Sequence, residues 1–168
     1  MLGSGKASRT PMSVTASGPG DRGAEIYDQY AAALYRQALL TLDDAGLAEQ
    51  VVCDILVDEC LRPPSAAAGG SASSARRRLA VSAYRRCQEL AAAPGWREHS
   101  PAQPPPARPA GCAGLDRLSR EERGALGLVL CGGVSYIQAS RELAISPQEM
   151  AGMLRAVLLG LTAARGGV

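Results

Sequence analysis

Three serines in the C-terminal third of the chain are each followed, three positions later, by a glutamate or a glutamine. In such a capping box the serine oxygen accepts a hydrogen bond from a backbone N–H of the first helical turn, and the acid or amide reaches back to the N-cap N–H. Each box therefore predicts the start of a helix. The pairs are Ser119 with Glu122, Ser135 with Gln138, and Ser146 with Glu149.

The second and third of these helix starts lie close together. The middle helix, expected from Tyr136 to Leu143, is short, and only Ala144 and Ile145 separate it from the third cap. Pro147 takes the first position of the third helix, where a missing N–H is tolerated and the fixed φ suits the helix. This spacing is typical of a helix-turn-helix unit, which places its second helix in the DNA major groove.

Length and composition limit the classes of protein that the chain can belong to. Its 168 residues suffice for one ordinary domain or two small ones. The five cysteines form no C-x-x-C pair, so neither a disulfide framework nor a zinc site is expected. No segment approaches the run of about twenty apolar residues that spans a bilayer, and no apolar signal core is present. We therefore expect a cytoplasmic protein with reduced thiols.

Nothing in the sequence indicates an enzyme. His99 is the single histidine, no glycine-rich loop is placed to cradle a phosphate, and no nucleophile has a base nearby. Gly132 and Gly133 are better explained as a helix C-cap and turn. We expect no catalytic residue, no cofactor, no metal and no small-molecule substrate.

The rest of the chain divides by composition and hydrophobic period. Residues 1–23 are rich in Ser, Gly, Thr and Pro, which indicates either a disordered tail or a mis-assigned start. Three helices are then expected, from Glu25 to Leu42, from Leu47 to Leu61, and from about Ala75 to Ala92. Their inward positions are predicted to be Tyr27, Tyr30, Leu34 and Ala38 in the first, Val51, Val52, Ile55 and Leu56 in the second, and Leu79, Ala83, Cys87 and Leu90 in the third.

A proline-rich stretch, residues 93–114, separates these helices from the capped ones. Its proline run favours extended polyproline II over a compact loop. We therefore expect an all-α fold of two small helical modules, residues 24–92 and 115–165. With few apolar groups in the linker, the modules should fold separately and move relative to one another.

The third predicted helix carries a basic face. Its arginines are either a solvated helix surface or a contact for the phosphates of DNA, and the net charge of +2 does not decide between them. They are Arg76, Arg77, Arg78, Arg85 and Arg86.

Taken together, the chain resembles the extracytoplasmic-function group of bacterial sigma factors. The N-terminal YDQYAAALYRQALLTLDDAGLAEQVVCDIL is similar to the second region of that family, and LSREERGALGLVLCGGVSYIQASRELAISPQEM is similar to the fourth. The resemblance implies a region-2-like helical bundle and a region-4-like helix-turn-helix. It also implies core RNA polymerase and promoter DNA as partners, and it leaves room for an anti-sigma protein.

Site residues follow from the resemblance. The helix after Asp44 would grip the polymerase through Glu49, Gln50, Asp54 and Asp58. DNA would be contacted by Arg76, Arg77, Arg78, Tyr84, Arg85 and Arg86 in the first module, and by Tyr136, Arg141, Ser146, Gln148, Glu149, Gly152 and Arg155 in the second.

The sequence also departs from the family pattern. The recognition helix has Ala151 and Met153 where the family commonly carries basic residues, and Gln50 stands where the family has an acid. Leu158 and Leu159 make the last helix apolar nearly all round, which is usual for a buried helix. The leading function is sigma-like transcription initiation. The alternative is a degenerate sigma-like regulator that acts through protein contacts with weak or no sequence-specific DNA binding.

Overall fold

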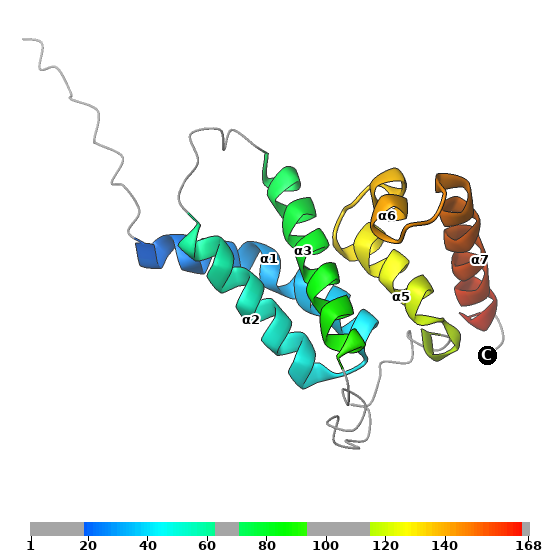
Figure 1. The fold of residues 1–168 in the computed structure, drawn as a ribbon, viewed down its shortest axis with the longest axis horizontal. Helices are drawn as coiled ribbons and strands as arrows, with labels where there is room; N and C mark the ends of the chain where they lie inside the picture. Colours follow the sequence, from blue (N-terminus) through cyan, green and yellow to red (C-terminus); the bar gives the residue numbers. More distant parts are fainter. Residues whose placement is uncertain (1–18, 63–70, 94–114, 166–168) are drawn as a thin grey trace, which may run out of the picture.

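The computed structural model describes residues 19–62, 71–93 and 115–165. Within these ranges the chain is all-helical and has no strand (Figure 1). The helices are α1 (Pro19–Leu42), α2 (Ala45–Leu61), α3 (Ala72–Ala92), η2 (Leu115–Arg117), α5 (Arg120–Leu126), η3 (Gly127–Cys131), α6 (Tyr136–Glu142) and α7 (Pro147–Arg165). None of these helices is both long and apolar enough to cross a membrane. The all-α prediction is confirmed.

The helix starts follow the predicted caps closely. At Ser119 and Ser146 both hydrogen bonds of the capping box are present. At Ser135 only half of it forms, because the serine oxygen accepts from Gln138 N at 3.3 Å and no return bond is made. The break between α1 and α2 is two residues, and Asp44 caps α2 by accepting from Leu47 N at 2.9 Å.

Three N-terminal boundaries differ from the prediction, and α2 begins at Ala45 instead of Leu47. α1 begins at Pro19, so residues 19–23 of the predicted tail are helical, and α3 begins three residues earlier than expected. Proline at the first helical position needs no N–H partner, which allows α1 to extend toward the N-terminus. Residues 1–18 and the predicted linker, apart from Ala93, lie outside the described residues.

The second helix buries the face that the hydrophobic period predicted, and the first and third do so in part, because Leu90 of α3 is only half-buried. Tyr30, Leu34 and Ala38 are buried, whereas Tyr27 is 61% exposed, which corrects its assignment to the core. Ile26, one residue earlier, packs partly buried against the core, so at this end of α1 it is Ile26 and not Tyr27 that faces inward. In α3 the Cys87 side chain is fully covered, and this burial raises the pKa of its thiol to about 12.

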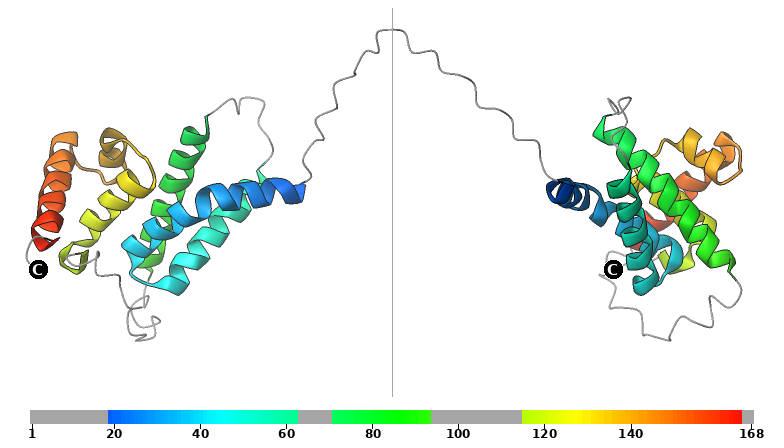
Figure 2. Two further views of the ribbon diagram at one scale, coloured as in Figure 1. Left: turned by 180° about the vertical axis from the view of Figure 1, so that it is seen from behind. Right: turned by 60° about the vertical axis from the view of Figure 1, so that its left-hand side comes forward.

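The two halves of the molecule share one hydrophobic core. Buried residues of α1, α2 and α3 form a single cluster with residues of the C-terminal half, among them Ala125, Leu128, Val134, Ala139 and Met150. α1 packs against η3 and α5 as well as against α2 and α3, and the views from two sides show the halves in contact (Figure 2). The expectation that the modules fold and move separately is therefore wrong for the described residues. No local sequence signal predicts this packing, because it joins segments far apart in the chain.

Small residues allow the close approach between the halves. A Cβ on Gly132 would lie 2.5 Å from Ala80 Cβ, and one on Gly124 would lie 2.7 Å from Cε2 of Tyr84. Gln37, also fully buried, lies beside Gly127 and donates from Nε2 to Ala80 O at 2.7 Å. This amide joins α1 to α3 at the point where η3 meets both.

The segment before α6 has a tight, unusual geometry. η3 is a π-helix, and Gly132 N closes it by donating to Gly127 O at 3.0 Å. Gly133 follows with φ of +65°, a left-handed conformation that glycine adopts without strain, and Val134 N donates to Leu128 O. The prediction of a C-cap and turn at these two glycines is confirmed.

Candidate nucleic-acid interface

The arginines of the predicted basic face of α3 have two kinds of partner, and three of them pair with carboxylates. Arg85 makes a two-pronged ion pair with Glu142 of α6, with N–O distances of 2.9 and 3.1 Å. Arg78 pairs with Glu59 of α2, and Arg86 lies between Glu89 at 3.2 Å and Asp54 at 3.7 Å. The charges of these three arginines are therefore largely compensated within the fold.

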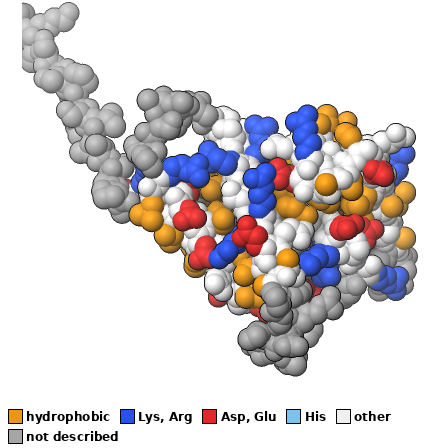
Figure 3. All heavy atoms as spheres, in the orientation of Figure 1, with side chains coloured by type: hydrophobic (Ala, Val, Ile, Leu, Met, Phe, Trp, Pro, Cys, Tyr) orange, Lys and Arg blue, Asp and Glu red, His pale blue; other side chains and the backbone are white. Residues whose placement is uncertain are grey.

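Arg76 and Arg77 have a different kind of partner. Arg76 donates to the backbone oxygen of Cys131 from Nε at 3.1 Å and from Nη2 at 2.6 Å, and Arg77 Nε donates to Ser73 O at 3.2 Å. A carbonyl oxygen fixes a guanidinium without cancelling its charge. The N-terminal part of α3 therefore keeps its positive charge, and Figure 3 shows basic side chains gathered over and beside this helix.

Tyr84 is not placed to stack on a base. Its side chain is 4% exposed, it packs against Gly124, and its hydroxyl accepts a hydrogen bond from Gln88 Nε2 at 2.6 Å. Burial raises the pKa of the hydroxyl. Tyr84 therefore belongs to the contact between the halves, and this corrects its assignment to DNA binding. The sequence could not show this, because the partner glycine lies forty residues away.

The helix-turn-helix forms as the spacing predicted. α6 ends at Glu142, Ala144 takes a left-handed φ of +55° in the turn, and Ile145 N donates to Ser140 O at 3.0 Å. The predicted contact residues Tyr136 and Arg141 are exposed on α6. Those at the start of α7, namely Ser146, Gln148, Glu149, Gly152 and Arg155, are exposed as well.

Glu149 is committed to its cap. Its carboxylate accepts from Ser146 N at 2.8 Å, and its own N–H donates to the Ser146 oxygen at 3.2 Å. The backbone hydrogen bond is the main reason why the pKa of Glu149 lies below its ordinary value. Gln148 and Arg155 are therefore better placed than Glu149 to contact bases from this helix.

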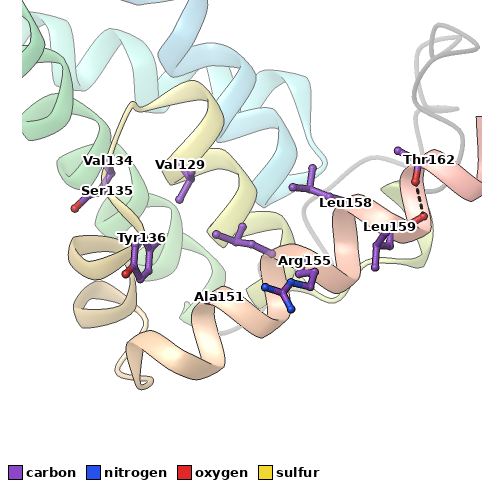
Figure 4. A pocket seen from close by; sticks show the side chains of 10 residues that line it. Val129, Val134, Ser135, Tyr136, Ala151, Arg155, Leu158, Leu159 and Thr162 are labelled. Atoms are coloured by element: carbon purple, nitrogen blue, oxygen red, sulfur yellow. Dashed lines mark hydrogen bonds between the residues drawn. The ribbon is translucent and has the colours of Figure 1, made fainter.

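An apolar groove runs between α7 and the turn before α6. Its volume is about 590 Å³, and Arg155 is its single charged residue (Figure 4). Leu158 and Leu159 on its wall are 46% and 64% exposed, so the described part of the fold does not bury the apolar outer face of α7. The described elements pack on only one side of α7, through Met150 and Val157. Sequence reasoning found the two leucines, and it named Tyr136 only as a DNA contact; it missed that Val129, Val134 and Tyr136 form the opposite wall.

The predicted polymerase-contact residues lie on the outer face of α2. Glu49, Gln50 and Asp58 are exposed, and Asp54 is half-buried beside Arg86. The same face carries apolar side chains that the sequence analysis did not single out: Val57 is 55% and Leu61 is 77% exposed. An apolar stripe with an acidic border is typical of a surface that docks a protein with basic groups.

The chain matches no protein-family model and no curated protein. The resemblance to extracytoplasmic-function sigma factors therefore stays a prediction. No group of three or more His, Cys, Asp or Glu within the described ranges is placed to hold a metal ion.

Proposed function

We propose that the protein is a sigma-like transcription initiation factor that binds core RNA polymerase and promoter DNA in the cytoplasm. The observation that supports this most is the helix-turn-helix, whose capped second helix exposes Gln148, Gly152 and Arg155 at its start. A helix presented in this way can enter the major groove with its N-terminal residues at the base edges. An anti-sigma protein is a further partner under this proposal.

The outer face of α2 is the proposed polymerase contact. Its exposed acid Asp58 lies beside Val57 and Leu61, and the exposed acid Glu49 lies about two turns earlier on the same helix. Acids on such a border guide a basic partner, and reversing their sign places like charges together. This face is therefore where the polymerase contact is most open to test by mutation.

We expect the double substitution Glu49→Lys with Asp58→Lys to weaken co-purification with core RNA polymerase at least tenfold, which is about 1.4 kcal/mol. The control is Glu25→Lys with Asp28→Lys, because these acids are also exposed on a helix and the change in net charge is the same. Equal yields of polymerase from both variants and the unchanged protein would remove α2 from the contact.

The apolar groove beside α7 favours the second candidate, a regulator that acts through protein contacts. Its wall residues Leu158 and Leu159 are exposed, and neither is among the predicted DNA contacts. Exposed apolar patches of this kind mark interaction sites. In the first function α7 binds DNA, and in the second it binds a protein.

Two single substitutions separate these functions. If α7 enters the major groove, Arg155→Ala should lower promoter affinity several-fold and Ala151→Lys should raise it, because each changes one phosphate or base contact. DNA affinity measured at one salt concentration, with Leu159→Ser as the control, distinguishes the cases. Insensitivity to both charge changes, together with loss of a protein complex in Leu159→Ser, would support the regulator and contradict DNA reading by α7.

A further inference from the structure

Arg76 is held at the junction of the two halves. Two of its N–H groups bond to the backbone oxygen of Cys131, at 3.1 and 2.6 Å, and its Nε lies 4.0 Å from the position of a Cβ on Gly133. A guanidinium has five N–H donors, so three remain for another acceptor. Because the side chain is already fixed, binding a ligand costs it little further rotamer entropy.

Arg36 of α1 is placed near the same turn by the residue that follows it. Its neighbour Gln37 packs on the turn, with Oε1 3.2 Å from the position of a Cβ on Gly132. Burial raises the pKa of the Cys131 thiol, and the nearby charges of Arg36 and Arg76 both oppose this rise. α1 and α3 therefore each bring an arginine to this turn: Arg76 bonds to Cys131 O, and Arg36 adjoins Gln37, which packs against Gly132. Arg36 was not among the site residues that the sequence indicated.

The charges of Arg36, Arg76 and Arg77 are not compensated by the described part of the fold. Arg78, Arg85, Arg86 and Arg123 each lie within 4 Å of a carboxylate. Among the described residues no carboxylate lies within that distance of Arg36, Arg76 or Arg77. A positive potential that attracts a polyanion is therefore expected here, and not at the C-terminal part of α3.

We propose that Arg36, Arg76 and Arg77 form a phosphate-binding site for the backbone of duplex DNA, built across the junction of the two halves. The proposal rests on the proposed function, because it takes promoter DNA as the ligand, and it moves the main electrostatic contact away from α7. Guanidinium groups suit this role because their planar forks match phosphate oxygens. The site needs both halves, since the turn at Cys131 positions the Arg76 side chain.

The test compares two triple variants with the same loss of charge. Arg36→Gln, Arg76→Gln and Arg77→Gln remove the proposed site, and Arg62→Gln, Arg85→Gln and Arg86→Gln remove three arginines that have carboxylate partners. Binding to a short random-sequence duplex is measured over a range of salt concentrations. Because each lost phosphate contact flattens the log–log salt slope by about 0.9, the first set should flatten it by about two to three and weaken binding at least tenfold. The control set should leave the slope unchanged.

Equal flattening in both sets, or an unchanged slope in the first, would overturn the site. The single variant Arg36→Gln shows whether the effect could come from loss of folding, because Arg36 makes no hydrogen bond or ion pair with another described residue. This variant should flatten the salt slope by about one. Failure of the proposed function can be told apart from failure of this site. Binding to DNA through these arginines without binding to core RNA polymerase would keep the site and remove the proposed function.

Discussion

Replacing Leu128 with alanine should lower the free energy of unfolding by about 2–5 kcal/mol, the usual range for a large aliphatic side chain removed from a core. Leu128 is fully buried in η3 and belongs to the core that both halves share. The loss should therefore destabilise both halves together. Urea unfolding followed by circular dichroism should show one transition at a lower midpoint.

The matched control for this substitution is Leu130→Ala. Leu130 lies two residues further along the same π-helix but is 60% exposed, so its removal should change stability by less than about 0.5 kcal/mol. Two separate transitions in Leu128→Ala, with the N-terminal half unaffected, would contradict the shared core.

A second large effect is expected at Gly132, where alanine should destabilise the fold by about 1–3 kcal/mol. The cause is space and not backbone conformation, because φ of Gly132 is −78°. The new Cβ would meet Ala80 Cβ at 2.5 Å and Leu128 O at 2.7 Å, so α3 and η3 would have to move apart. Thermal unfolding measures the change.

Gly160→Ala is the control for this effect and should have the opposite sign. Gly160 lies in α7, and a Cβ there would meet nothing within 4 Å. Alanine in an exposed helix interior is favoured over glycine by roughly 0.5–1 kcal/mol. If both glycine variants were equally stable, the close contact of α3 with η3 would be in doubt.

Local structure could be predicted from the sequence because its causes are local. The serine caps position α5, α6 and α7, and the hydrophobic period found the inward residues of α2, all of which are buried. Each of these signals links residues no more than one or two turns apart. The helix-turn-helix is the sum of two such signals, and it forms as expected.

The packing of the two halves could not be predicted, because nothing local specifies it. Arg85 and Glu142 are 57 positions apart, and Arg76 and Cys131 are 55 apart. A basic run looks the same in a sequence whether its arginines have carboxylate partners or not. Tyr84 was misassigned because its partner Gly124 is distant in the sequence, and Arg36 was overlooked because it lies outside the arginine run of α3.

Run-off transcription with purified core RNA polymerase tests the central claim most directly. Genomic fragments that contain upstream regions serve as templates, with and without the protein. The proposed function predicts discrete transcripts that appear only when the protein is present, and that are lost with Glu49→Lys and Asp58→Lys but kept with Glu25→Lys and Asp28→Lys. Identical products with and without saturating protein, on every fragment, would contradict it.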